Sequence, residues 1–121
     1  MDTRNKDSPI AYICSPYSGD TEGNTLAARR YSRYATDLGY IALAPHLLLP
    51  QYLSEETERE LAIRTDLRLL DLCQELWVFG NRISEGMKRE IAYAQEAGIP
   101  VRYIKEEEIY VREGRRNEED K

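Results

Sequence analysis

The chain has 121 residues, which is the size of one domain with a single hydrophobic core. Hydrophobic residues make up 41% of it and charged residues 32%, as is ordinary for a globular protein. The net charge of -5 argues against a general nucleic-acid binder, which needs a basic surface, but it allows a small anionic ligand held by backbone N–H groups.

Local features argue against metal-binding, secreted and membrane proteins. Cys14 and Cys73 lie in apolar segments and are interpreted as reduced core thiols. The single histidine and the absence of a C-x-x-C motif make a zinc site unexpected. The polar N-terminus has no signal-peptide core, and no apolar run approaches the about 20 residues of a membrane span. We therefore expect a cytoplasmic protein that uses no metal and no cofactor.

Strand and helix patterns alternate in the first part of the chain. Residues 1–8 are polar and are predicted to be flexible. The apolar run 10–15 predicts a buried strand. Apolar residues with helical spacing predict a helix over about 24–38, with Gly39 as its C-terminal cap, and 40–44 reads as a second strand.

The middle of the chain is less regular. Two prolines prevent a continuous helix over 45–53, which is predicted to be an ordered loop. A helix is expected from about Ser54 to Leu72, because Ser54 is a good cap and Thr57 with Glu60 has capping-box spacing.

The last part of the chain repeats the alternation. A strand is predicted over 75–80, a helix over 84–97 ending at Gly98, and a strand over 99–104. The charge-dense residues 105–121 are predicted to be a solvated tail.

The order of these elements predicts the fold. Apolar strands that alternate with amphipathic helices indicate a parallel sheet covered on both faces. We expect a three-layer, Rossmann-like α/β fold of the flavodoxin type with four to five strands. Its ligand site would lie beyond the carboxyl ends of the strands, at the loops 15–20, 44–53 and 80–84.

Two carboxylates are candidates for chemistry. Glu90 lies beside the apolar stripe of helix 84–97, at the mouth of the expected cleft, although it could instead be a half-exposed carboxylate paired with Lys88 or Arg89. Asp66 has only apolar neighbours one turn away, and desolvation would raise its pKa and suit it to donate a proton. The alternative for Asp66 is a helix-flank residue without function.

The loops add candidate binding residues. Ser84 and Gly86 begin helix 84–97, where free N–H groups can hold an anion, although Ser84 is also simply a good N-cap. His46 follows a proline in a cleft loop; the alternative is that it only caps a turn. The loop after the first strand lacks a G-x-G-x-x-G dinucleotide motif and supplies Ser15, Tyr17, Ser18 and Gly19.

Tyr12 in the first strand, Asp66, and the segment Ser84-x-Gly86-x-x-x-Glu90 together resemble the nucleoside 2-deoxyribosyltransferase superfamily. The pattern is most similar to its 2'-deoxynucleoside 5'-phosphate N-hydrolase branch and to a small bacterial and phage family within the superfamily. The resemblance covers about residues 9–104, which we interpret as the domain. It departs from the hydrolase branch at 16–18, where that branch carries an arginine-containing loop.

The resemblance implies cleavage or transfer of the N-glycosidic bond of a 2'-deoxynucleoside 5'-monophosphate. Glu90 would be the nucleophile that attacks C1', Asp66 would protonate the base, and Tyr12 would orient Glu90. A serine at position 84, in place of a carboxylate, would accept a 5'-phosphate. The other substrate-binding residues would be Ser15, Tyr17, Ser18, Gly19, His46 and Gly86.

Two other functions remain open. The same fold could serve as a binding module that holds a nucleotide or a nucleotide signal without turnover, or as a structural interaction protein. The expected partner is a small nucleoside or nucleotide, not a nucleic acid or a membrane. A homodimer or higher homo-oligomer is also expected, with Tyr31, Tyr34 and nearby apolar residues of the first helix as the candidate interface.

Overall fold

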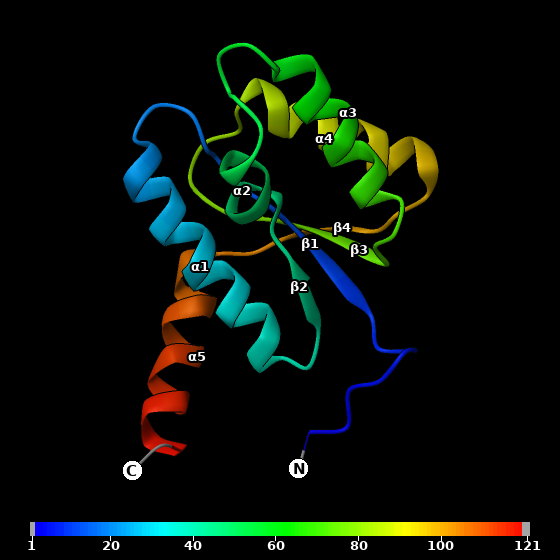
Figure 1. Cartoon of the computed structure of the whole chain (residues 1–121). Helices are drawn as coiled ribbons and strands as arrows, with labels where there is room; N and C mark the ends of the chain where they lie inside the picture. The colour runs from blue at the N-terminus through cyan, green and yellow to red at the C-terminus, as the bar shows by residue number, and fades with distance from the viewer. Residues whose placement is uncertain (1, 120–121) are drawn as a thin grey trace.

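Four parallel strands form one sheet in the computed structural model, which describes residues 2–119 (Figure 1). The strands follow the order β2-β1-β3-β4, so β1 and β3 are the inner strands. In register, Tyr12 of β1 lies opposite Leu43 on one side and Leu76 on the other. The strands are β1 (Ile10–Cys14), β2 (Ile41–Leu43), β3 (Glu75–Val78) and β4 (Val101–Tyr103).

Helices cover both faces of this sheet and complete the predicted three layers (Figure 1). Helices α1 and α5 lie on one face, and α3 and α4 lie on the other. None of the helices within residues 2–119 has the length and apolar character needed to cross a bilayer. The helices are α1 (Thr21–Asp37), α2 (Pro45–Leu48), the short 3-10 helix η1 (Leu49–Gln51), α3 (Arg59–Leu70), α4 (Glu85–Ala97) and α5 (Glu106–Glu119).

Alternation along β1 divides the core into two halves. Ala11 and Ile13 point to the α1/α5 face, whereas Tyr12 and Cys14 point to the α3/α4 face. The strand is buried on both sides, which explains its continuous apolar pattern. The α3/α4 face is therefore the one on which β1 can offer polar side-chain atoms to a helix.

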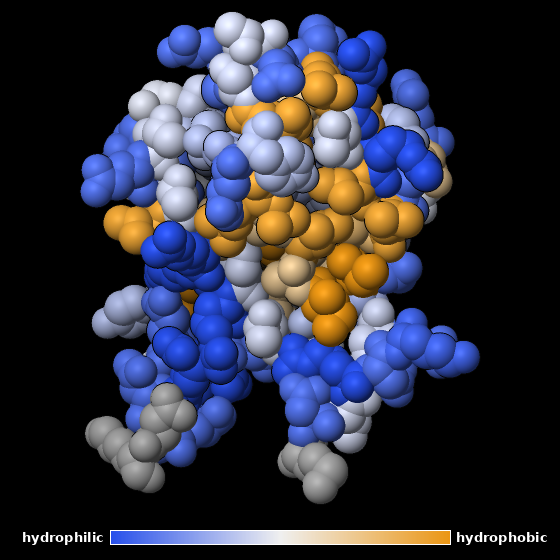
Figure 2. All heavy atoms as spheres, in the orientation of Figure 1, coloured by the Kyte–Doolittle hydropathy of each residue, from blue (hydrophilic) through white to orange (hydrophobic). Residues whose placement is uncertain are grey.

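Two tyrosines of the predicted dimer interface do not reach the surface. Tyr31 and Tyr34 are only 7% and 8% exposed, because they pack inward under α5. The Tyr31 ring stacks on Phe79 with centroids 4.5 Å apart. Figure 2 shows that hydrophobic side chains gather on the surface over α2 and β2, where Ile41 and Leu48 are exposed, and Leu26 of α1 is exposed as well.

Helix α1 begins earlier than expected. The Asp20 carboxylate accepts a hydrogen bond from the Gly23 N–H at 3.1 Å, so it caps the helix before the apolar spacing starts. Helix α4 agrees with its prediction: Ser84 is the N-cap, and Gly98 ends the helix in a left-handed conformation with φ of 75°.

The segment 45–58 also differs from its prediction. The absence of one continuous helix agrees with the prediction, but residues 45–51 form the two short helices α2 and η1 where a loop was expected. Pro45 lies in the first turn of α2, where its missing N–H is harmless. The helix predicted from Ser54 begins only at Arg59. Ser54 does not cap it, because the N-cap position is Glu58 and the Ser54 Oγ accepts the Thr57 N–H at 3.3 Å in a separate turn.

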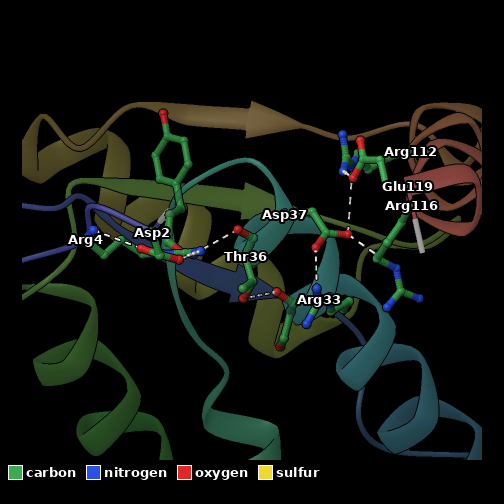
Figure 3. Close-up of polar contacts among 10 residues, drawn as sticks. Asp2, Arg4, Arg33, Thr36, Asp37, Arg112, Arg116 and Glu119 are labelled. Carbon is green, nitrogen blue, oxygen red and sulfur yellow. Dashed lines mark hydrogen bonds and ion pairs between the residues drawn. The ribbon is translucent and has the colours of Figure 1, made fainter. Parts of the chain in front are cut away.

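The predicted solvated tail is wrong for residues 106–119, which form helix α5 on the outside of α1 (Figure 1). Ile109 is 1% exposed and anchors the helix in the core. The buried Asp37 carboxylate lies 2.9 Å from Arg33, 3.8 Å from Arg112 and 3.6 Å from Arg116 (Figure 3). The buried side chain of Ile109 and the ion pairs with Asp37 therefore hold α5 on the domain, although most of its residues are charged. Residues 120 and 121 lie outside the described chain.

The N-terminal segment lies against the same end of α1. The Arg4 guanidinium donates to the backbone carbonyls of Thr36 at 2.9 Å and Tyr40 at 3.0 Å (Figure 3). Residues 2–8, predicted to be flexible, are thus joined to the end of the first helix; Met1 lies outside the described residues.

Candidate active site

A cleft of about 380 Å³ opens beyond the carboxyl ends of the inner strands, on the α3/α4 side. Its walls come from all three loop regions that were predicted to face a ligand, together with α3 and α4. The segment α2–η1 and the residues after it contribute an apolar side, which includes Leu49, Pro50 and Leu53. Such a hollow, with an apolar wall and a few polar groups, is typical of small-molecule sites.

Glu90 is the buried carboxylate at the floor of this cleft. It is 4% exposed, although it lines the cavity. The Tyr12 hydroxyl donates a hydrogen bond to Glu90 Oε2, and the Cys14 Sγ lies 3.5 Å from Oε1. Residues 12 and 14 are two apart on β1, so both side chains point toward α4 from the same face of the strand.

The alternative of a surface ion pair for Glu90 is excluded by this geometry. Lys88 pairs instead with Glu85 at 3.1 Å, and Arg89 pairs with Glu60 at 3.3 Å. Both cations are on the outer side of α4. Glu90 therefore faces the sheet and the cleft, as the spacing of its apolar neighbours indicated.

Burial raises the pKa of Glu90 to about 7, and the hydrogen bonds from Tyr12 and Cys14 partly oppose that rise. A hydrogen-bond donor stabilises the charged carboxylate, whereas the low-polarity surroundings destabilise it. Glu90 thus keeps its proton to a higher pH than an exposed glutamate does.

Asp66 lies on α3 across the cleft from α4, and its Oδ1 is buried without a hydrogen-bond partner in residues 2–119. Burial, followed by the charges of Glu90 and Glu55, raises the pKa of Asp66 to about 8. Asp66 therefore keeps its proton to a higher pH than an exposed aspartate does, which suits a proton donor. Two carboxyl groups that share a cleft titrate as a pair, and such a pair can divide the roles of acid and nucleophile between its members.

The N-terminus of α4 forms the part of the cleft near Ser84 and Gly86. The Ser84 Oγ accepts the Met87 N–H at 3.2 Å, which leaves its own O–H free to donate. A side chain at Gly86 would meet nothing within 4 Å, because the position borders open space. Both residues are where the sequence predicted a binding surface for an anion.

The other predicted binding residues divide into two groups. Tyr17, Ser18 and His46 line the cleft, with the Tyr17 and His46 rings 5.1 Å apart. Ser15 and Gly19 do not line it. Ser15 is 1% exposed with its hydroxyl unpartnered in residues 2–119, and Gly19 makes a turn with φ of 98°.

His46 is held in one tautomer by the buried strand end. Its Nε2 lies 2.9 Å from the Ser15 carbonyl oxygen, so this nitrogen carries the hydrogen and donates it. Burial lowers the pKa of His46, which keeps the ring neutral at neutral pH. Its Nδ1 is then an acceptor.

The family model for the domain of unknown function DUF7768 matches residues 9–104. The chain belongs to the DUF7768 family. Among solved structures, it is similar to the 2-deoxyribosyltransferase of Bacillus psychrosaccharolyticus, with a TM-score of 0.59, 19% sequence identity, and coverage of 78% of this chain and 70% of that one. The DUF7768 chain therefore has the nucleoside 2-deoxyribosyltransferase-like fold. No curated protein matches it in sequence.

Sequence reasoning missed two cations of the DUF7768 cleft. Arg82 and Arg59 both line it. The Arg82 guanidinium donates to the Ser18 carbonyl oxygen at 2.9 Å and forms no salt bridge within the described chain, while Arg59 lies 3.7 Å from Glu55. Arg82 lies in the loop 80–84, which the sequence predicts to face the ligand, so its place at the cleft could have been predicted. Its hydrogen bond to Ser18 in the first loop could not, because the two residues are distant in sequence.

Within residues 2–119, the DUF7768 chain has no cluster of three or more histidine, cysteine or acidic side chains that could hold a metal ion. The polar groups of the cleft are instead carboxyl groups, two guanidinium groups and the N-terminus of α4, with the Glu55 carboxylate 3.7 Å from Arg59. Such a set can transfer a proton, provide a carboxylate nucleophile and bind an anion.

Proposed function

We propose that this DUF7768 protein cleaves or transfers the N-glycosidic bond of a 2'-deoxynucleoside 5'-monophosphate, with Glu90 as the nucleophile. The observation that carries the proposal is the Glu90 carboxylate, which is buried, held by Tyr12 and open to the cleft that Asp66 lines. Burying a carboxylate is costly, and within residues 2–119 Glu90 forms no salt bridge with a cation that would offset that cost. The fold shared with a 2-deoxyribosyltransferase supports the same reaction class.

The first step forms one bond and breaks another. An oxygen of Glu90 attacks C1' of the deoxyribose to form a glycosyl ester, while the C1'–N bond breaks and its electron pair stays on the base. Asp66 gives its proton to the departing base. Because Asp66 holds that proton at neutral pH, the base leaves as a neutral molecule.

The second step restores the enzyme. Water, or the nitrogen of a second base, attacks C1' and the ester bond breaks, which returns the carboxylate of Glu90. The proton released by the incoming nucleophile passes to Asp66, which is ionised at this stage. Both groups then have their starting protonation. Hydrolysis and transfer differ only in the molecule that attacks.

The preference for a monophosphate rests on the hydrogen-bond donors and the cation that line the cleft. Ser84 and the N–H groups of α4 can donate to a phosphate, and the Arg82 guanidinium adds a positive charge that no carboxylate neutralises within residues 2–119. This arginine supplies the charge that the segment 16–18 lacks relative to the hydrolase branch. A carboxylate at position 84 would repel the same group.

The test is release of free base from a panel of 2'-deoxynucleosides and their 5'-monophosphates, measured by chromatography, with and without a second base as acceptor. Glu90→Gln should abolish release, because it keeps the side-chain shape but removes the nucleophile. Glu96→Gln, on the exposed side of the same helix, is the matched control and should react normally. If no substrate releases base but nucleotides bind tightly to both wild type and Glu90→Gln, the protein is a nucleotide-binding module instead.

A further inference from the structure

Cys14 contacts the reactive carboxylate, although its residue type and apolar setting indicated only a core thiol. Its Sγ lies 3.5 Å from Glu90 Oε1, within the range of a thiol hydrogen bond. The other carboxylate oxygen, Oε2, accepts from Tyr12. Each oxygen of Glu90 thus has one donor, and both donors come from one face of an inner strand.

We propose that Cys14 is a positioning residue that, together with Tyr12, fixes the plane of the Glu90 carboxylate against the sheet. The inference rests on the proposed function for its catalytic meaning, but the contact itself can be tested in the resting protein. It concerns a thiol that holds a nucleophile through a hydrogen bond and that does not itself react.

A single donor would leave the carboxylate free to turn. The terminal torsion of glutamate is broad, so packing of the stem does not determine the direction of the oxygen lone pairs. With Tyr12 on Oε2 alone, rotation about that bond can swing Oε1 through the cleft. The Cys14 thiol on Oε1 removes this freedom, because any rotation then breaks one of two hydrogen bonds. A nucleophile is effective only when its attacking oxygen is already aimed.

The thiol remains a donor under all ordinary conditions. Burial, followed by the nearby Glu90 charge, raises the pKa of Cys14 well above its usual value, so the sulfur keeps its hydrogen. A thiol is a weaker donor than a hydroxyl. It can therefore orient the carboxylate while withdrawing less electron density from the attacking oxygen than a second hydroxyl would.

Cys73 provides the internal comparison. It is buried in the same hydrophobic cluster, but its Sγ lies 3.4 Å from the backbone carbonyl of Leu69, one turn earlier along the chain. That contact satisfies the thiol locally and has no link with the cleft. If burial alone explained both cysteines, replacing either one should have the same effect on Glu90.

The Glu90 titration has contributions from every element that faces the carboxylate. Tyr12 and Cys14 come from β1, and Asp66 comes from α3. The remaining titratable or charged side chains that line the cleft are Tyr17, His46, Glu55, Arg59, Arg82 and Glu85. Because the Cys14 variants change residue 14 alone, all of these side chains are the same in each variant and in wild type.

The experiment replaces Cys14 by Ala, which removes the donor, and by Ser, which keeps a donor of similar size. Titration of the Glu90 carboxyl carbon by NMR, assigned by its absence in Glu90→Gln, should show a higher midpoint in Cys14→Ala than in wild type. In Cys14→Ser the midpoint should lie close to the wild-type value, because serine keeps a donor. Cys73→Ala should leave the midpoint unchanged. In base release, Cys14→Ala should lower turnover about two- to tenfold near pH 6, and raising the pH should recover part of it.

The outcomes separate this inference from the proposed function. A shifted titration in Cys14→Ala without any base release by wild type supports the contact and overturns the enzyme. Normal base release with an unchanged titration and an unchanged pH profile in Cys14→Ala overturns the role of Cys14. Equal effects of Cys14→Ala and Cys73→Ala also overturn it. Should the alanine variant fail to fold, Cys14→Val fills the space without a donor and must give the same upward shift.

Discussion

The hydroxyl of Tyr12 and the carboxylate of Glu90 are hydrogen-bonded, although one lies in the first strand and the other in the fourth α-helix of the chain. The bond runs from an inner strand of the sheet to the floor of the cleft. With the Cys14 thiol on the other carboxylate oxygen, it holds a buried acid that has no salt bridge within residues 2–119. This relationship gives the protein a candidate nucleophile whose direction is determined by the most rigid part of the fold.

Tyr12→Phe removes the stronger of the two donors to Glu90. Because a donor stabilises the ionised carboxylate, its loss should raise the pKa of Glu90 further and shift the ascending limb of the pH–rate profile upward. We expect kcat/KM for base release to fall about tenfold or more at pH 6 and to recover partly as the pH rises.

A similar pair outside the cleft supplies the control. Tyr40 donates to the Glu75 carboxylate at 2.8 Å on the opposite side of the molecule, so Tyr40→Phe loses a comparable hydrogen bond without touching Glu90. Its pH–rate profile should match that of wild type. An unchanged ascending limb in Tyr12→Phe would show that the phenol does not control the ionisation of Glu90.

Asp66→Asn should make the protein more stable at high pH. The pKa of Asp66 is raised in the folded state, chiefly by burial, to about 8, so the folded protein binds more protons than the unfolded chain between about pH 4 and pH 8. Stability from this group is complete below its unfolded pKa and is lost as the pH rises through its folded pKa. Asparagine removes the ionisation, so the Tm difference between variant and wild type should be small at pH 4 and should grow up to about pH 8.

Thermal unfolding at several pH values measures this difference directly. Asp7→Asn, at an exposed position near the N-terminus, makes the same chemical change away from the cleft and should give a small difference that does not grow with pH. An Asp66→Asn variant that loses stability as the pH rises, relative to wild type, would mean that Asp66 is ionised and paired in the folded protein.

Several elements could be predicted because local chemistry decides them. The continuous apolar run at 10–15 requires burial on two faces. The N-cap Ser84 and the C-cap Gly98 determine where α4 begins and ends. The placement of Glu90 beside an apolar stripe on that helix then determines its direction toward the sheet. These features need only neighbours within one or two turns of the chain.

Other features depend on partners that are distant in sequence. The contact between Cys14 and Glu90 requires the register of α4 on β1, which no local pattern gives. Arg82 reaches a carbonyl in the first loop, and α5 relies on Ile109 and on the pairing of its arginines with Asp37. The charge-rich composition of residues 105–121 predicts a solvated tail, because the many charged residues outweigh Ile109, the apolar residue that holds the helix in the core.

Arg82→Gln should weaken binding of a monophosphate more than binding of the unphosphorylated nucleoside. The guanidinium lines the cleft without a salt bridge in residues 2–119, so its charge is available to a phosphate. The KM for the monophosphate should rise about tenfold, as expected for the loss of one charge-assisted hydrogen bond, while kcat changes little. Arg82→Lys, which keeps the charge, should have an intermediate effect.

The comparison needs an arginine outside the cleft. Arg68 pairs with Asp71 at 3.2 Å on the exposed side of α3, so Arg68→Gln should leave both KM values unchanged. Equal increases in KM for nucleoside and monophosphate in Arg82→Gln would instead indicate that Arg82 only supports the loop through Ser18.

Helix α5 should behave as part of the core, and two neighbouring aliphatic residues test this. Ile109 is 1% exposed between α1 and the sheet, whereas Val111, on the same helix, is 53% exposed. Ile109→Ala should lower the free energy of unfolding by about 2–4 kcal/mol, because it leaves a cavity, while Val111→Ala should change it by less than about 0.5 kcal/mol. Denaturant titration measures both values. If Ile109→Ala costs no more than Val111→Ala, then α5 is not packed on the domain in solution, and its arginines do not help to bury Asp37.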